Sequence, residues 1–432
     1  MKNLLYGALA LIASAAFAST TPDKFVTVRP DGNFYCADTL YTYVGTNLWY
    51  GAILGSEGTG GDRSRLCREL DTLQSLGINN LRVMVGAEGR DSLPCHIMPV
   101  LQTAPGVYND TLLIGLDYLL YQLEQRDMKA VLYLNNAWEW SGGYGAYLEW
   151  AGYGPAPVPA IDGYRPYCEY VAQFVLSDSA KALAARHVRA IVSRTNSITG
   201  RPYTLSPAIM AWQIANEPRA FAPDSLHKEA FARWIASQAA LIKSIDPNHL
   251  VSTGSEGRFG CEYDIDLWRR IHLDPNIDYG IIHLWPYNWR WADSTTLLTG
   301  LDTVRQYSLD YILPHAEMMR AAVKPLVLEE FGYPRDGMGL APGSPTEARN
   351  SFYRFVLGLV GEGKPLAGCN FWGWGGLVTP ASDTWRPGQP YTGDPAQEPQ
   401  GLYSVFAADT ATTAIIRQAA RRCVSPSRAR TL

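Results

Sequence analysis

The sequence predicts an α/β protein built as one (β/α)8 barrel. Eight short apolar runs bounded by turn residues have the pattern of buried strands, and segments with helical spacing alternate with them. Near-continuous apolar strands that alternate with helices form parallel sheets covered on both faces, and closure into a barrel is the economical arrangement for eight of them. The chain has 432 residues, of which 47% are hydrophobic, and this composition excludes an intrinsically disordered protein.

The candidate strands recur along the whole chain. They are residues 41–50, 79–87, 129–138, 209–218, 249–257, 279–288, 325–333 and 368–376. Helical periodicity predicts helices at 64–77, 112–127, 228–246 and 347–363, with a closing helix at 410–423 and a frayed tail after it. A doubly wound open sheet is the alternative, although no G-x-G-x-x-G motif follows the first strand.

The chain begins with the pattern of an exported protein. Residues 1–18 contain one lysine, an apolar run and the small residues Ala16 and Ala18, which predicts a signal peptide cleaved after Ala18. The run of roughly 15 apolar or small residues is shorter than the about 20 that span a bilayer. We therefore expect a secreted or periplasmic protein without a membrane anchor, with one catalytic domain at 19–432.

Charge and aromatic content narrow the class of ligand. The formal charge of −4 comes from 37 basic and 41 acidic side chains without blocks of either sign, which argues against nucleic-acid partners. The 13 Trp and 25 Tyr suit stacking on sugars, although an aromatic-rich core is the alternative explanation. Seven cysteines without C-x-x-C spacing predict no zinc or iron–sulfur site, and their odd number leaves at least one thiol unpaired. We expect a monomer.

Two connections are longer than simple turns. Residues 141–166 and 387–400 are rich in Gly and Pro and follow candidate strands. In a barrel such segments lie at the C-terminal face, where ligands bind, so we expect two loops that shape a cleft.

Two candidate strands end in carboxylates within distinctive motifs. They are Asn216-Glu217-Pro218-Arg219 and Glu329-Glu330-Phe331-Gly332. At a barrel mouth, two carboxylates can flank one glycosidic bond, although strand-end acids also bind backbone amides without any catalytic role. Since successive strand residues point to opposite faces, only one of Glu329 and Glu330 can aim into the mouth. We expect Glu330 there, with Glu329 turned toward the helix layer or an adjoining hydrogen bond.

The order of these motifs resembles glycoside hydrolase family 5, in its endo-β-1,4-mannanase branch. The resemblance rests on N-E-P at 216–218, H-x-W at 283–285, E-F-G at 330–332 and F-W at 371–372. It extends to G-T-N-L-W-Y at 45–50, L-R-V at 81–83 and L-N-N-A-W at 134–138. It implies a single catalytic barrel, retention of configuration, a β-mannan polysaccharide or oligosaccharide as substrate, and neither a metal nor an organic cofactor.

The resemblance also assigns roles to residues. Glu217 corresponds to the acid/base and Glu330 to the nucleophile. Arg82 resembles the arginine beside the nucleophile, where a guanidinium favours an ionised carboxylate, although a structural ion pair is its alternative role. Asn216 resembles the residue that hydrogen-bonds the sugar 2-hydroxyl, and a turn-forming Asn is the plainer explanation. His283 occupies the position of a histidine near the carboxylates, with a purely structural barrel histidine as the alternative.

One position departs from the pattern of many relatives. Trp285 stands where they carry a Tyr whose hydroxyl holds the nucleophile, and an indole offers only an N–H donor. Tyr287 and Tyr263 are unproven substitutes. Trp372 resembles the tryptophan floor of the sugar subsite beside the cleaved bond, and Trp374 is the second choice. Further candidates, each equally explained by scaffold packing, are Trp49, Trp138, Arg219 and the loop acid Glu256.

The sequence therefore predicts a retaining endo-β-1,4-mannanase. A β-1,4-glucanase or an exo-acting mannan hydrolase of the same family is the alternative within enzymes. A glycan-binding protein without catalysis is the alternative of another class, and the intact pair of Glu217 and Glu330 argues against it.

Overall fold

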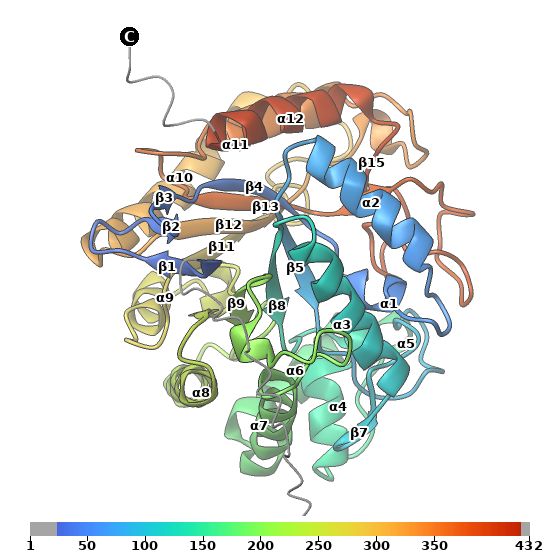
Figure 1. Ribbon diagram of the computed structural model, residues 1–432, viewed down its shortest axis with the longest axis vertical. Coiled ribbons are helices and arrows are strands. Elements are labelled where there is room, and N and C mark those ends of the chain that lie inside the picture. Colours follow the sequence, from blue (N-terminus) through green and yellow to red (C-terminus); the bar gives the residue numbers. More distant parts are fainter. Residues whose placement is uncertain (1–23, 425–432) are drawn as a thin grey trace, which may run out of the picture.

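The computed structural model describes residues 24–424, which form one barrel surrounded by helices (Figure 1). The predicted signal peptide and the tail beyond the last helix lie outside the described residues. No helix in residues 24–424 combines the length and apolar character needed to cross a membrane.

Eight parallel strands form the nearly closed barrel, which confirms the predicted fold class. Each lies inside one of the predicted runs: β4 (Tyr43–Asn47), β5 (Asn80–Met84), β8 (Lys129–Tyr133), β9 (Ile209–Gln213), β10 (Leu250–Ser252), β11 (Gly280–Leu284), β12 (Leu326–Phe331) and β13 (Gly368–Phe371). Every residue in these eight strands is buried, as expected for strands covered on both faces.

The ring has one weaker junction. Among the described strands, no ladder joins β10 to β11. Asp278 bridges them instead: its carboxylate accepts from the Val251 N–H at 2.6 Å, and its own N–H donates to the Val251 carbonyl at 2.9 Å. The junction is therefore held by Asp278 and by the His283 N–H, which donates to the Glu256 carbonyl at 3.1 Å, rather than by a register of strands.

Helices cover the outside of the barrel, and several begin where a side chain caps the backbone. They are α2 (Arg63–Ser75), α3 (Asp110–Glu124), α7 (Asp178–Val192), α8 (Ser225–Ile245), α9 (Ile265–His272), α10 (Leu301–Ala321), α11 (Glu347–Leu357) and α12 (Thr410–Val424). The side chains that accept from first-turn amides at five of these starts are Asp62, Asn109, Ser177, Asp224 and Asp264. The predicted helix at 347–363 ends earlier than expected, at Leu357.

An antiparallel sheet covers the N-terminal end of the barrel. It consists of β1 (Val26–Val28), β2 (Phe34–Cys36) and β3 (Thr39–Leu40). Phe34 is fully buried, with its ring 5.2 Å from that of Tyr279. This apolar plug leaves the opposite, C-terminal end for chemistry.

The prediction of a loop at 141–166 is wrong. The segment forms α4 (Gly143–Trp150), α5 (Pro159–Asp162) and the start of α6 (Tyr164–Val171), flanked by 3₁₀ turns at Glu139–Ser141 and Ala172–Leu176. A Cβ on Gly142, where φ is 91°, would lie 1.9 Å from the Glu88 carbonyl, so this glycine serves a close backbone approach and does not mark a long loop.

Residues 387–400 do lack helices and strands, as predicted. The buried Asp394 fixes this segment by accepting from the backbone N–H groups of Gly401 at 2.8 Å and Tyr403 at 2.9 Å. The remaining short elements are α1 (Gly51–Leu54), β6 (Gln102–Ala104), β7 (Val107–Tyr108), β14 (Trp374–Gly376), β15 (Val405–Phe406) and the 3₁₀ turns Tyr203–Leu205, Phe259–Cys261 and Asp336–Met338.

Candidate active site

A cavity opens at the C-terminal ends of the barrel strands, with about 1120 Å³ of empty space including its mouth. Seven of the ten site residues predicted from the sequence line it, and they come from the C-terminal ends of five strands: Trp138, Asn216, Glu217, Arg219, Trp285, Glu330 and Trp372. The other three, Arg82, His283 and Trp49, are fully buried behind its wall.

Glu217 follows β9 in a strained backbone conformation. Its φ of 48° is left-handed, which is uncommon for a residue other than Gly and is typical of functional sites. Its N–H donates to the Gly254 carbonyl at 3.0 Å, which ties this turn to the loop after β10. The Trp138 indole N–H donates to Glu217 Oε2 at 2.6 Å. The carboxylate is therefore held from two sides of the cavity.

Glu330 reaches the cavity through an irregularity in β12. In the register with β11, Ile282 pairs with Leu328 but His283 pairs with Glu330, so Glu329 is the extra residue of a β-bulge. Bulges beside active sites redirect side chains. Glu329 accepts a hydrogen bond from Gln213 and lies 3.4 Å from Arg82 Nε, inside the barrel. The expected hydrogen bond of Glu329 is thus present, but its turn toward the helix layer is wrong because the bulge breaks strand alternation.

Arg82 organises the floor of the site from the middle of β5. It donates to Glu330 Oε1 through Nη1 and to Asn216 Oδ1 through Nη2, the latter at 2.8 Å. Its Nε donates to Gln213 at 2.7 Å, and Nη1 also reaches Asn47 Oδ1 at 3.2 Å. This network fixes the nucleophile candidate and Asn216 against one another.

His283 joins the two carboxylates. Its Nδ1 lies 2.8 Å from Glu217 Oε1 and 3.2 Å from Glu330 Oε2. Burial alone would lower the pKa of His283, but the charges and hydrogen bonds of both carboxylates raise it to about 9. Burial raises the pKa of Glu217, and the larger opposing effects of His283, Arg219 and Trp138 bring it below its usual value. One protonated imidazole therefore serves both acids.

The contacts around Glu330 show which group takes the place of the tyrosine hydroxyl that many relatives have at position 285. Trp285 packs edge-on to Trp372, with ring centres 6.1 Å apart, and to Tyr403 at 4.9 Å. Of the two suggested substitutes, Tyr263 is 77% exposed, and no hydrogen bond joins Tyr287 to Glu330 among the described residues. The second oxygen of Glu330 instead has His283 as its partner.

The half-buried Arg219 and the buried Glu256 form an ion pair beside Glu217. Arg219 Nε donates to Glu256 Oε2 at 2.6 Å, and the guanidinium lies 5.2 Å from the centre of the Trp138 ring. Burial raises the pKa of Glu256 to about 7 against the opposing charge of Arg219. Glu256, the loop acid named as a further candidate from the sequence, is thus part of the cavity wall.

The candidate tryptophans differ in their access to the cavity. Trp372 lines it, whereas Trp374 is fully buried and donates to Glu69 Oε2 at 2.7 Å. Trp49 is also fully buried and donates to the Gly393 carbonyl at 2.9 Å, so it supports the 387–400 segment from behind. Trp49 and Trp374 can therefore influence a ligand only indirectly, through the residues that lie between them and the cavity.

Several cavity residues were not identified from the sequence. Tyr164 and Cys168 come from α6, Gln397 and Glu398 from the 387–400 segment, and the others are Trp140, Asn288 and Pro395. Burial, together with the charges of Asp394, Glu330 and Glu217, raises the pKa of Glu398 well above the usual carboxyl value. The aromatic content of both connections was the available signal, but it did not single out these positions.

Within the described residues, one group of side chains in the catalytic cavity is arranged as metal ligands could be. Within residues 24–424, Glu217, His283 and Glu330 are the group of potential ligands whose donor atoms lie within 4.8 Å of one another. Since His283 and Arg82 already place positive charge against these carboxylates, the donor set does not fit a resident cation.

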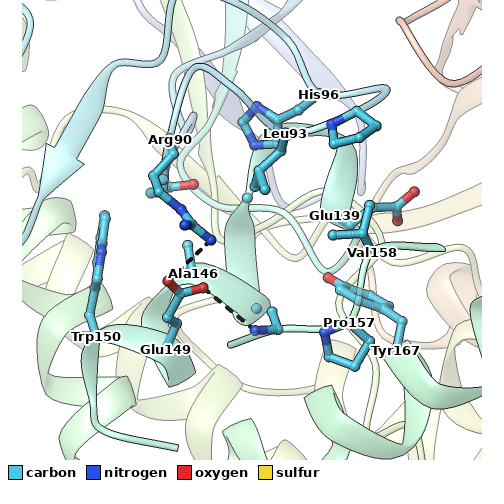
Figure 2. A pocket seen from close by; sticks show the side chains of 16 residues that line it. Arg90, Leu93, His96, Glu139, Ala146, Glu149, Trp150, Pro157, Val158 and Tyr167 are labelled. Carbon is cyan, nitrogen blue, oxygen red and sulfur yellow. Dashed lines mark hydrogen bonds and ion pairs between the residues drawn. The ribbon is translucent and has the colours of Figure 1, made fainter. Parts of the chain in front are cut away.

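A second pocket has Glu139 in its lining (Figure 2). We call it the rear pocket; it has about 570 Å³ of empty space including its mouth. Its polar lining includes Glu88, Arg90, His96, Glu139 and Glu149, with Trp150 at one side. Glu139 separates the two spaces, because its neighbours Trp138 and Trp140 face the catalytic cavity.

Comparison with known proteins agrees with this geometry. A family model described as GH family 5 beta-mannosidase-like matches residues 23–427. A rice protein (Oryza sativa subsp. japonica) named putative mannan endo-1,4-beta-mannosidase 9 is 29% identical over 396 residues, covering 88% of this chain and 86% of its own.

Solved structures give the same family. The glycoside hydrolase family 5 mannosidase from Rhizomucor miehei, as a mutant in complex with mannosyl-fructose, has a TM-score of 0.85 at 33% identity, covering 94% of this chain and 98% of its own. An endo-beta-1,4-mannanase from Thermotoga petrophila, at 22% identity, shares the fold with a TM-score of 0.67 over 90% of this chain and 78% of its own. With a family match over nearly its whole length, the chain belongs to the β-mannosidase-like proteins of glycoside hydrolase family 5 and is a glycoside hydrolase.

Proposed function

We propose that the protein hydrolyses internal β-1,4-mannosidic bonds of mannan with retention of configuration. One observation carries the proposal: a carboxylate oxygen of Glu217 and one of Glu330 lie within 4.8 Å of each other in an aromatic-walled cavity. Retaining pairs stand about 5 to 5.5 Å apart, whereas inverting pairs stand roughly 6.5 to 9.5 Å apart to admit a water molecule. The short separation supports direct attack by a carboxylate.

In the first step, Glu330 attacks the anomeric carbon while Glu217 protonates the departing oxygen. Arg82 holds Glu330, and Asn216 offers its amide to the sugar 2-hydroxyl from a position fixed by Arg82. Because the pKa of His283 is raised to about 9, the Glu217–His283 pair keeps a proton at neutral pH that Glu217 can deliver.

In the second step, Glu217 acts as base for the water that releases the sugar from Glu330. The left-handed turn at Glu217 and the indole hydrogen bond from Trp138 keep the carboxylate in place for both steps. Trp372 supplies a flat apolar face for the distorted sugar ring.

The names of the relatives support mannan as the substrate. The two acids Glu217 and Glu330 do not distinguish mannan from glucan, since β-1,4-glucanases use the same pair of carboxylates. The rice relative and seven further plant proteins are named mannan endo-1,4-beta-mannosidases, at 25–30% identity. Reducing-sugar release is expected from galactomannan and glucomannan but not from carboxymethylcellulose. Release from carboxymethylcellulose alone would favour a glucanase, and no turnover on any β-glycan would favour a binding protein.

A second candidate, exo action on mannan chains, is favoured by the 387–400 segment. It brings Gln397 and Glu398 into the cavity, and the raised pKa of Glu398 leaves an uncharged carboxyl suited to hydrogen-bonding sugar hydroxyls. The Rhizomucor protein with the high TM-score is named a mannosidase. Mannohexaose labelled at its reducing end separates the two: products of several lengths indicate endo cleavage, and mannose or mannobiose from chain ends alone indicates exo cleavage.

We also propose that the protein is exported and acts as a monomer. The amino-terminal pattern of residues 1–18 supports export. Amino-terminal sequencing of the exported protein should begin at Ser19, and sedimentation should give the mass of one chain.

A further inference from the structure

An aromatic ridge extends from the catalytic cavity toward solvent. It consists of Trp289, Phe259 and Tyr263. Trp289 lines the cavity, and its ring centre lies 4.4 Å from that of Phe259 in an edge-on arrangement. The Phe259 ring lies 5.0 Å from that of Tyr263. The ridge therefore continues the wall of the cavity beyond its rim.

The outer end of the ridge is unusually exposed. Tyr263 is 77% exposed, although large aromatic side chains generally become buried in a folded protein. Glu262 and Tyr263 both have left-handed backbones, with φ values of 56° and 60°. Such a conformation is unfavourable for a residue other than glycine. Strain of this kind in consecutive residues is retained where it places a side chain for use.

The turn that carries Tyr263 is fixed on both sides. The Asp264 N–H donates to the Cys261 carbonyl at 3.0 Å, and the Asp264 side chain caps α9 through the Leu267 N–H at 2.9 Å. Lys228 holds the same carboxylate at 3.0 Å. Phe259 rests against Tyr311 with ring centres 5.1 Å apart. The ridge is thus preorganised, and little ordering is required when a ligand binds.

The ridge lies on the acid/base side of the cavity. From Glu217 the contacts pass to Arg219, then to Glu256, and Phe259 follows three residues later in the same loop. Trp372 lines the same cavity and packs against Trp285, with ring centres 6.1 Å apart. Since Glu217 protonates the leaving oxygen, the leaving sugars extend past Glu217 and toward this ridge.

We propose that Trp289, Phe259 and Tyr263 bind sugar units of the leaving part of a mannan chain, with Tyr263 as the outermost contact. The proposal rests on the proposed function and names the surface that the longer substrate uses. The flat apolar faces of pyranose rings stack on such aromatic planes. A second copy of the chain is a poorer occupant, because three side chains offer far less than the about 1,200 Å² that a stable interface buries.

The test compares substrates of different length. Tyr263→Ala should lower kcat/KM on mannohexaose about two- to tenfold, mainly through KM, and leave 4-nitrophenyl β-mannoside unchanged. Tyr263→Phe should retain the activity of the unsubstituted protein on both substrates. Tyr121→Ala, on the outer helix α3, is the matched control and should change neither.

A second variant separates sugar binding from folding. Tyr263→Asn suits the left-handed backbone, so its Tm should equal or exceed that of the unsubstituted protein while mannohexaose kinetics weaken as in Tyr263→Ala. Unchanged mannohexaose kinetics in both variants of an active enzyme would overturn this inference alone. Absence of turnover on every β-mannoside by the unsubstituted protein would contradict the proposed function, and a dimer lost in Tyr263→Ala with intact kinetics would assign the ridge to a second copy.

Discussion

The catalytic cavity and the rear pocket both contain buried carboxyl groups beside tryptophan, yet their electrostatics differ. In the catalytic cavity, a cation lies against each of the two candidate catalytic acids: Arg82 on Glu330 and His283 on Glu217. In the rear pocket, Glu88 has only neutral partners, the Tyr147 hydroxyl at 2.9 Å and the Gly143 N–H at 3.1 Å, and burial raises its pKa to about 8. Burial alone therefore gives a neutral acid, and a cationic partner is what provides a carboxylate that can attack.

The largest effect is expected from Glu330→Ala. Loss of the nucleophile should lower turnover on the order of 10⁴-fold or more while leaving substrate affinity and Tm largely intact. Added azide should restore part of the activity and give an α-configured glycosyl azide, because it attacks from the vacated face. Glu329→Gln is the matched control next in sequence. Azide rescue of an inactive Glu329→Ala variant, with normal turnover in Glu330→Ala, would reverse the two roles.

Glu217→Ala should have the next largest effect, and it should depend on the leaving group. Loss of general acid catalysis costs about 10²- to 10⁴-fold on mannan, whose leaving sugar needs the proton. A dinitrophenyl β-mannoside needs little protonation, so stopped-flow measurements should show a burst of phenolate followed by slow turnover. Equal losses on both substrates would count against the acid/base role.

Trp372→Ala tests the sugar-facing wall of the catalytic cavity. Because this ring supports the distorted sugar, its removal should lower kcat about tenfold while KM changes little. Trp374→Phe, behind the wall, is the comparison and should keep kcat within a few fold. Steady-state kinetics on mannohexaose measure both. A rise in KM alone for Trp372→Ala would reduce the ring to a simple binding contact.

Trp289→Ala and Trp150→Ala compare the two pockets directly. Trp289 lines the catalytic cavity, so its loss should raise KM on mannan about two- to tenfold without lowering kcat. Trp150 lines the rear pocket and should have the smaller effect. If Trp150→Ala raises KM as much as Trp289→Ala does, the rear pocket also binds substrate and the comparison fails.

The smallest effect on activity is expected from Glu88→Gln, which should remain within about twofold of the unsubstituted enzyme. The measurable effect of Glu88→Gln should instead be on the pH dependence of the protein's stability. With a folded pKa of about 8 and an unfolded value near 4.5, Glu88 holds a proton only in the folded state between these values, so it lowers stability as pH rises from about 4.5 to 8. The drop in Tm between pH 5 and pH 8 should be smaller in Glu88→Gln. An equal drop in both proteins would contradict the neutral state of Glu88.

The barrel strands were predictable because each lies within a continuous apolar run that ends in turn residues. The two candidate catalytic carboxylates follow from that pattern, since Glu217 lies shortly after β9 and Glu330 lies near the end of the bulged β12. The helices of 141–166 were not predictable, because glycines such as Gly142 that serve close backbone approach look the same in sequence as loop glycines. Strand alternation likewise could not reveal the bulge at Glu329, which depends on the register with β11.

Residues that act through distant partners were the hardest to find. Gln397 and Glu398 enter the cavity only because Asp394 and Trp49 fix their segment, and nothing local marks them. His283 was identified as a neighbour of the acids, but its contact with both of them depends on distances that only the structure provides. Spacing along the chain thus points to the candidate reacting groups, whereas their electrostatic partners can be identified only in the assembled barrel.

The central claim is that Glu330, held by Arg82 and His283, is the attacking carboxylate of a retaining mannanase. A 2-deoxy-2-fluoro-β-mannosyl fluoride should form a covalent glycosyl-enzyme that turns over slowly, and peptide mapping by mass spectrometry locates the sugar. The account predicts a single modified peptide with the sugar on Glu330. A sugar on Glu329, or an enzyme that consumes the reagent without ever becoming labelled, would contradict it.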